Sequence, residues 1–211
     1  MVFDTTPMPF VGCAIIAKNE EKTISRAINS VIPHVDMIVL NSVGSTDNTN
    51  LVAESTVPPW LRLKVIGPDW LGAADALNRS ASECQEMGAD WILRMDADCI
   101  LRGSLPDFRE YSYDVGAINM KYFNKREDHP NGEMFSCWRT WIYRPETSTY
   151  KGVRHEGLFQ YKQLIGSNAG TYYHYDDSGA RPRVKATYMG DAEAMREAMK
   201  TETDPAMIQR Y

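Results

Sequence analysis

The stretch DWILRMDADC, residues 90–99, decides the fold of this chain and the place of its site. A mostly apolar run of strand length ends at Asp96, and a second carboxylate, Asp98, follows two residues later. In an open parallel sheet, ligands bind outside the carboxyl ends of the strands. Residues two apart in an extended chain project to the same side, so both carboxylates can converge on a divalent cation that carries substrate phosphates. The alternative is a solvated turn, since an Asp-x-Asp pair also occurs by chance.

The residues before this stretch alternate between strand and helix patterns. Apolar runs and periodicity predict strands over 11–17, 35–40, 61–66 and 91–96, and helices over 24–31, 51–54 and 70–87. We expect Asn19 to cap the first helix and Gly88 to end the third. Strands that alternate with helices are typical of a doubly wound, mostly parallel sheet.

The second half of the chain is less regular. Residues 115–123 and 135–143 predict strands, and the polar loop between them is either a mobile lid or a plain hairpin connection. Asp191 is expected to cap a helix, and Asp204 before Pro205 to begin a last one. Because no repeat or composition shift marks a second domain, we expect one domain over 1–211, divided into 11–101, 102–189 and a helical tail over 190–211.

Composition narrows the class of protein. The 211 residues carry a formal net charge of −5, which argues against a general nucleic-acid binder. Four cysteines without metal-ligand spacing predict free thiols in a reducing compartment. The sequence contains no signal-peptide pattern and no apolar run long enough to span a membrane. We therefore expect a soluble, cytoplasmic protein.

Several segments, in the right order, resemble the family 2 glycosyltransferases of the GT-A fold. They are AKNEE at 17–21, GSTDNT at 44–49, Asn78, the DWIL and DAD segments at 90–98, GVRHE at 152–156, and His174-Tyr175. This resemblance implies an α/β fold: a Rossmann-like, mostly parallel sheet flanked by helices, with a smaller antiparallel or irregular C-terminal half. Residues 11–101 would then bind the nucleotide sugar, and residues 102–189 the acceptor.

The resemblance also implies a reaction. A sugar would pass from a nucleoside-diphosphate sugar to an acceptor hydroxyl, with inversion and with Mn²⁺ or Mg²⁺ as cofactor. A bound cation would stabilise the charge on the leaving diphosphate. A UDP-sugar is the expected donor, although Ser42 stands where the family usually has the Asp that contacts the base. Cys99 likewise stands where an acid is common.

The same resemblance assigns the metal ligands and the base. Asp98 is the expected metal ligand, Asp96 binds the metal or the ribose, and His174 is the candidate for a further ligand, unless it is a packed histidine of its aromatic cluster. Glu156 is the expected base, with His155 orienting it or substituting for it; the alternative is an acid that stabilises a hairpin. Asp128 is the reserve base.

Further residues are expected to line the nucleotide pocket: Lys18, Asn19, Ser42, Asp47 and Asn78, together with Asp96. The basic run of Arg181, Arg183 and Lys185 either grips the diphosphate or forms a solvated face. Arg94 lies inside an apolar strand and requires an acid as partner.

Two other classes of protein compete with this hypothesis. A nucleotidyltransferase shares a related sheet and metal use, but residues 17–21 lack the glycines of its phosphate loop. A nucleotide- or sugar-binding module with degraded catalysis is suggested by Ser42 and Cys99. The acceptor stays open among a glycan, a protein, a small molecule and a modified DNA base.

Overall fold

The computed structural model describes residues 8–67, 69–108, 111, 115–125, 133–152, 157–175 and 185–208. The first half contains β1 (Val11–Ala17), α1 (Ile24–Val31), the short 3₁₀ helix η1 (Ile32–His34), β2 (Met37–Ser42), α2 (Thr49–Thr56), β3 (Arg62–Ile66), α3 (Ala73–Glu86) and β4 (Trp91–Asp96). The second half contains β5 (Cys99–Arg102), β6 (Ala117–Lys125), β7 (Glu133–Tyr143), β8 (Thr149–Lys151), β9 (Gly157–Phe159), β10 (Leu164–Tyr175), α4 (Lys185–Met199) and α5 (Pro205–Ile208).

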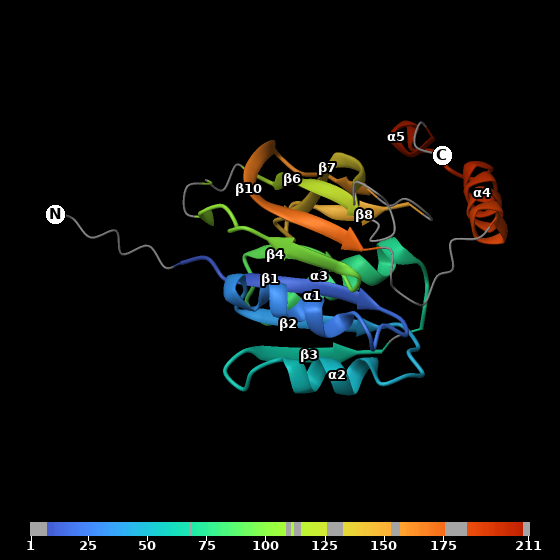
Figure 1. The fold of residues 1–211 in the computed structure, drawn as a ribbon. Helices are drawn as coiled ribbons and strands as arrows, with labels where there is room; N and C mark the ends of the chain where they lie inside the picture. The colour runs from blue at the N-terminus through green and yellow to red at the C-terminus, as the bar shows by residue number, and fades with distance from the viewer. Residues whose placement is uncertain are drawn as a thin grey trace.

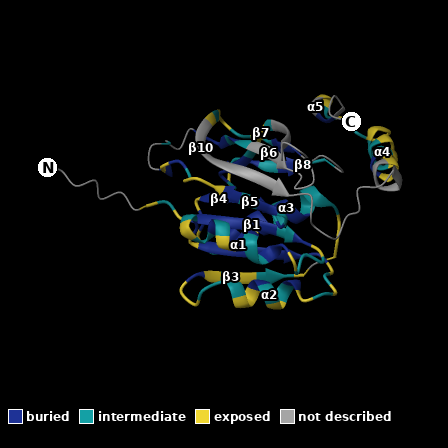
Figure 2. Ribbon diagram, viewed as in Figure 1, coloured by how far each residue is buried: buried dark blue, intermediate teal, exposed yellow. Residues whose placement is uncertain are grey.

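The first half is a parallel sheet between two layers of helix. Its strands lie in the order β3-β2-β1-β4, and β1 pairs in parallel with both β2 and β4. The apolar face of α1, together with α2, packs on one side of the sheet, and α3 packs on the other (Figures 1 and 2). Because β1 and β2 are buried on both sides, their sequences do not alternate between apolar and polar residues; β2 is apolar as far as Leu40 and then ends in Asn41 and Ser42.

The packing of α3 on β1 depends on the absence of a side chain at Gly12. A Cβ at this position would lie 2.8 Å from Cys84 Cβ, 2.9 Å from Cys84 Sγ and 3.0 Å from Ala89 Cβ. Gly12 therefore allows the last turn of α3 to approach the strand closely. The fully buried Cys84 and Leu77 then fill this side of the core.

The sheet continues beyond β4 in the order β7-β6-β10-β5, and it must curl. Four strand spacings of about 4.8 Å would separate β4 from β5 by about 19 Å in a flat sheet. Only Ala97 and Asp98 connect the two strands, and three Cα–Cα steps reach about 11 Å at most. Irregular pairing between β6, β7 and β10 accommodates the bend, and Leu101 N donates to Ser30 Oγ of α1 at 3.0 Å.

The remaining elements complete this half. β8 and β9 form a separate two-stranded sheet, and Asn78 links β8 to α3. The C-terminal helices α4 and α5 follow (Figure 1), and Lys151 Nζ of β8 lies 3.2 Å from Asp204 Oδ2 just before α5. No helix in the described part of the chain is long and apolar enough to cross a membrane.

The structure confirms the α/β fold and all the predicted elements of the first half, with ends that shift by at most three residues. The helix expected over 70–87 begins at Ala73, after Gly72 with its φ of 127°, and Gly88 follows it with a φ of 98° as expected. All four cysteines are free; Cys13, Cys84 and Cys99 are buried and Cys137 is half-buried.

Two predicted caps are wrong. Thr23, not Asn19, precedes α1, because Asn19 adopts a left-handed conformation with a φ of 55° and bonds a neighbouring loop. Asp191 lies inside α4, which begins six residues earlier at Lys185. Asp191 is mostly buried there, and it cannot cap a helix that already includes the six residues before it.

We expect Gly12→Ala to lower the free energy of unfolding by about 1–3 kcal/mol, because the new methyl group overpacks the contact between α3 and β1. Urea unfolding followed by circular dichroism measures this change. Gly190→Ala is the matched control: Gly190 lies within α4 with nothing within 4 Å of an added Cβ, so this variant should be neutral or slightly more stable. Equal stability of both variants would contradict the close approach.

Candidate active site

The carboxyl ends of β1, β2 and β4 meet at one edge of the sheet. In the parallel register, Ala17 lies opposite Ser42 and Ile16 lies opposite Asp96. The loops that leave these three strands therefore start side by side. This edge is where an open α/β sheet binds its ligands, and it gathers most of the residues expected to line the nucleotide pocket.

Asp96 and Asp98 come together at this edge, as their spacing predicted. One ligand atom from each of Asp96, Asp98 and Cys99 lies within 4.8 Å of the others. Asp96 and Asp98 are half-buried, and Cys99 is fully buried. Burial, reinforced by the carboxylates of Asp98 and Asp96, raises the pKa of the Cys99 thiol well above its usual value. The thiol is thus protonated at neutral pH, so the two carboxylates are the groups of this cluster whose chemistry suits a hard cation.

Arg94 has the acidic partner that the sequence required. Its Nη2 lies 3.3 Å from Asp96 Oδ1, two residues along the same strand. The guanidinium stacks between aromatic rings, 5.4 Å from the centre of Trp141 and 5.3 Å from that of Tyr150. Only 12% of the Arg94 side chain is exposed. A positive charge is therefore held rigidly beside the carboxylate pair, where it orients Asp96.

The backbone register brings His174 to the same place. In the antiparallel pairing of β10 with β5, His174 lies opposite Cys99, the residue that follows Asp98. The sequence alone could not show this, because 75 residues separate the two strands at this point. The pairing brings the backbone of the third expected ligand next to the carboxylate pair.

Reciprocal hydrogen bonds join the loop after β1 to the loop after β2. Asn19 N donates to Ser45 Oγ at 3.1 Å, and Thr46 N donates to Asn19 Oδ1 at 2.8 Å. Glu20 N donates to Thr49 Oγ1 at 2.7 Å. Asn48 N donates to Glu21 Oε2 at 3.1 Å. The AKNEE and GSTDNT segments are therefore one rigid unit, which explains the left-handed backbone at Asn19.

Asp47 is central to the hydrogen bonds that clamp the loop after β1 to the loop after β2. Its Oδ2 accepts from Glu21 N at 3.1 Å, and its Oδ1 accepts from Thr49 N at 3.0 Å and from the Thr49 hydroxyl. Asp47 therefore satisfies an N–H at the start of α2. Burial alone would raise the pKa of Asp47, but the hydrogen bonds from Thr49 and Glu21 outweigh it and lower that pKa.

The other expected pocket residues differ in exposure. Lys18 is exposed directly after β1, whereas Ser42 is 4% exposed. Asn41, which was not among the expected pocket residues, is fully buried, and its Nδ2 donates to Ala76 O of α3 at 3.0 Å. Its Oδ1 has no partner among the described residues. Position alone, one residue before Ser42 at the end of β2, was the signal that could have identified it.

Asn78 docks β8 against α3. Its Nδ2 donates to Tyr150 O at 2.9 Å, and its Oδ1 accepts from Tyr150 N at 2.8 Å and from Thr149 Oγ1 at 3.2 Å. The amide thus bonds backbone in both directions, as a strand neighbour would. Its expected contact with the nucleotide sugar stays a prediction.

Several expected site residues lie outside the described residues. They are the base candidates Glu156, His155 and Asp128, and the basic residues Arg181 and Arg183. Lys185 is the first residue of α4. Their roles stay predictions from the sequence.

Comparison with known sequences gives a family. The sequence model of the family described as Glycosyl transferase family 2 matches residues 13–161. A protein of Rickettsia felis described as an uncharacterized glycosyltransferase is 40% identical over 106 residues, which are 50% of this chain and 35% of that protein. A protein of the same description from Rickettsia bellii is 38% identical over 103 residues, 49% of this chain and 32% of that protein. The matched region spans about a third of these relatives.

Comparison with solved structures gives the fold. Glucosyl-3-phosphoglycerate synthase from Mycobacterium tuberculosis, solved with Mn²⁺, UDP and phosphoglyceric acid, matches with a TM-score of 0.54 and 17% identity, over 93% of this chain and 80% of that one. A mannosyltransferase from Pyrobaculum calidifontis, solved with GDP-Man and Mn²⁺, matches with a TM-score of 0.58 and 14% identity, over 96% of this chain and 67% of that one.

We expect Asp47→Ala to lower the free energy of unfolding by about 1–2 kcal/mol at pH 7, because a helix cap and a bond between loops are lost. The folded-state pKa of Asp47 is lowered from 3.8. Its contribution is therefore fully present above about pH 4 and disappears as the pH falls through the folded-state pKa. Urea unfolding at pH 7, 4 and 3 measures the difference between wild type and variant.

The matched control is Asp69→Ala, which removes an exposed carboxylate from the loop before α3. Its effect on stability should stay within about 0.5 kcal/mol at every pH. A difference between wild type and Asp47→Ala that does not shrink in acid would show that the ionised carboxylate is not what holds the clamp.

Proposed function

We propose that this chain, which belongs to glycosyl transferase family 2, transfers a sugar from a nucleoside-diphosphate sugar to an acceptor hydroxyl with inversion at the anomeric carbon. The observation that carries the proposal is the convergence of Asp96 and Asp98 at the carboxyl edge of the sheet. The family match covers both the strand that ends in this pair and the loops beside it.

The residues at this edge fit a divalent cation. Two carboxylates lie close together and half-buried, and the neighbouring thiol is protonated. Mg²⁺ and Mn²⁺ prefer such oxygen ligands, with substrate phosphates completing the shell. We assign Asp98 and Asp96 as ligands, and His174 as a further one because its backbone pairs with that of Cys99. A cation held here would stabilise the negative charge that develops on the leaving diphosphate.

The chain's own groups orient the donor. The clamped loops after β1 and β2 present Lys18 and Asn19 beside Ser42, and Arg94 fixes the direction of Asp96. Such a preorganised edge avoids reorganisation at the moment of reaction. A UDP-sugar is the proposed donor, as the family resemblance implies, and the neutral Ser42 in place of the usual Asp can still bond the edge of a pyrimidine. The solved neighbours hold UDP in one case and GDP-Man in the other.

Glu156 is the proposed base. It belongs to the segment that connects β8 to β9, and β8 is fastened to α3 through Asn78. Glu156 would take the proton of the acceptor hydroxyl as that oxygen attacks the anomeric carbon from the side opposite the diphosphate. His155 would orient the carboxylate or replace it. The cytoplasm is the proposed place of action.

We expect calorimetry to detect one of UDP, GDP, CDP and dTDP binding in the presence of Mn²⁺, with UDP first. Asp98→Asn should weaken this binding by about tenfold to a hundredfold, because a metal ligand loses its charge. Without Mn²⁺, wild type and variant should bind equally weakly. Asp69→Asn is the control and should match wild type. If no nucleotide binds wild type under any condition, the chain is a binding module rather than a transferase.

We expect Glu156→Gln to bind the same nucleotide with unchanged affinity. The variant should cleave the sugar donor to nucleoside diphosphate about 10²–10⁴ times more slowly, because general-base catalysis is lost. Release of the nucleoside diphosphate, followed with a coupled assay, measures the rate. Asp128→Asn is the comparison variant and should keep the wild-type rate. A slow Asp128→Asn beside a normal Glu156→Gln would assign the base to the loop after β6 instead.

A further inference from the structure

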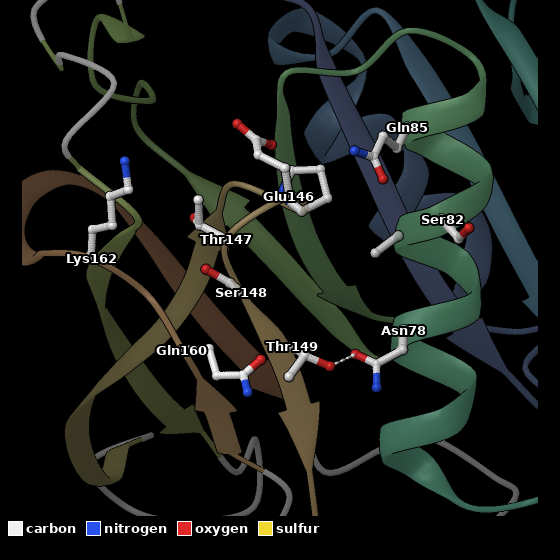
Figure 3. A pocket seen from close by; sticks show the side chains of 11 residues that line it. Asn78, Ser82, Gln85, Glu146, Thr147, Ser148, Thr149, Gln160 and Lys162 are labelled. Atoms are coloured by element: carbon white, nitrogen blue, oxygen red, sulfur yellow. Dashed lines mark hydrogen bonds between the residues drawn. The ribbon is translucent and has the colours of Figure 1, made fainter.

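A polar groove runs along α3 on the side away from β1. Its volume is about 500 Å³, within the range of small-molecule sites. One wall is the exposed side of α3, and the other consists of the connection from β7 to β8 and the segment after β9 (Figure 3). The helix α3 begins near the carboxyl edge of the sheet and runs back from it. The groove therefore extends from Asn78 toward Gln85, away from the carboxylate pair of Asp96 and Asp98.

The walls of the groove are held in place by hydrogen bonds and close packing behind them. Asn78 holds Thr149 and Tyr150 against α3. At Gly116, an added Cβ would lie 2.6 Å from Lys162 N, so only glycine allows the segment after β9 to pack so closely on the start of β6. Gly116 N also donates to Gln163 O at 3.0 Å. The groove is therefore a preformed site rather than a gap between mobile loops.

The side chains that line the groove leave their hydrogen-bonding groups available. The side chains of Ser82, Gln85, Glu146, Gln160 and Lys162 form no hydrogen bond or ion pair with any residue of the described part of the chain. In Figure 3, Gln85 on α3 and Gln160 on the opposite wall direct their amides toward the space between the walls. Gln160 has a φ of 66°, a conformation that residues other than glycine rarely adopt. Such outliers concentrate at functional sites.

This lining selects a neutral ligand rich in hydroxyl groups. Amides and hydroxyls both donate and accept, as a sugar ring requires. The single ammonium of Lys162 is balanced by the carboxylate of Glu146, so the groove carries no net charge that would select a phosphate. Its apolar lining is limited to Ala81 and Pro145, which excludes a lipid or an apolar drug-like molecule.

The position of the groove relates it to the acceptor. Thr149 and Gln160, on the groove wall, stand at or next to the near ends of β8 and β9, and the far ends of these paired strands lead into 152–156, the segment of the proposed base. A chain of sugars that reaches the base at one end can therefore follow the hairpin into the groove. We infer that the acceptor is an oligosaccharide or longer glycan, one of whose sugars, remote from the reacting hydroxyl, binds in this groove. This inference rests on the proposed function.

An array of oligosaccharides built from glucose, galactose, mannose, rhamnose and N-acetylglucosamine tests the inference by direct binding. We expect wild type to retain at least one glycan, and the double variant Gln85→Ala, Gln160→Asn to bind it at least about tenfold more weakly, because two sets of hydrogen bonds are lost. Asn at position 160 keeps the tolerance for a positive φ. Gln163→Ala removes an exposed glutamine next to the groove and should bind as wild type does.

A second variant guards against loss of folding. Ser82→Trp, at an exposed position on α3, should fill the groove and abolish glycan binding while the melting temperature stays unchanged. Glycan binding that survives in both groove variants, or an array on which wild type retains nothing, overturns the inference. Calorimetry with UDP and Mn²⁺ on the same proteins separates the two proposals. If nucleotide binding is intact and the groove variants still bind glycan, only the proposed glycan site is refuted. If wild type binds no nucleotide, the proposed transferase function is refuted.

Discussion

The two-residue connection between β4 and β5 constrains the rest of the structure. It forces β5 to begin beside the end of β4, although β7, β6 and β10 lie between them in the hydrogen-bonded order. The sheet meets this requirement by curling until its last strand returns to the middle of the molecule. The carboxylate pair stands at the point of return, so the second half of the chain closes around Asp96 and Asp98. This closure brings the backbone of His174 next to Cys99.

The candidate site is held in place both by the register of the parallel sheet and by side chains that fix its loops. The parallel half supplies an edge that any sheet of this type would have, with strand ends and loops in register. The loops themselves are then fixed by side chains that bond backbone, as Asp47 does for Glu21 and Thr49 and as Asn78 does for Tyr150. Such bonds resist rearrangement, since breaking one leaves a polar backbone group unsatisfied. The edge is therefore rigid before a ligand arrives.

The sequence predicted what depends on local pattern. The strand that ends at Asp96 and the helix over 24–31 follow from apolar runs and periodicity, and both are confirmed. β5, β8 and β9 were missed because each has only three or four residues, and β5 also depends on β10, a partner far along the chain. β10 was missed too, although it has 12 residues. The predicted cap at Asn19 was wrong because its side-chain amide oxygen accepts a hydrogen bond from Thr46 N, in a loop 27 residues away, rather than from the next helix. The spacing of the carboxylate pair predicted its convergence, whereas His174 in β10 was expected beside it only from the family resemblance.

The positive charge of Arg94 bears on whether folding depends on a bound cation. Its buried guanidinium, held between Trp141 and Tyr150, balances part of the charge of the carboxylate pair within the polypeptide itself. This positive charge offsets part of the repulsion between the two carboxylates. In small zinc domains, by contrast, the ion supplies the folding energy and its removal unfolds the chain. Here Arg94 supplies part of the balancing charge, so we expect the native state to persist without a bound cation.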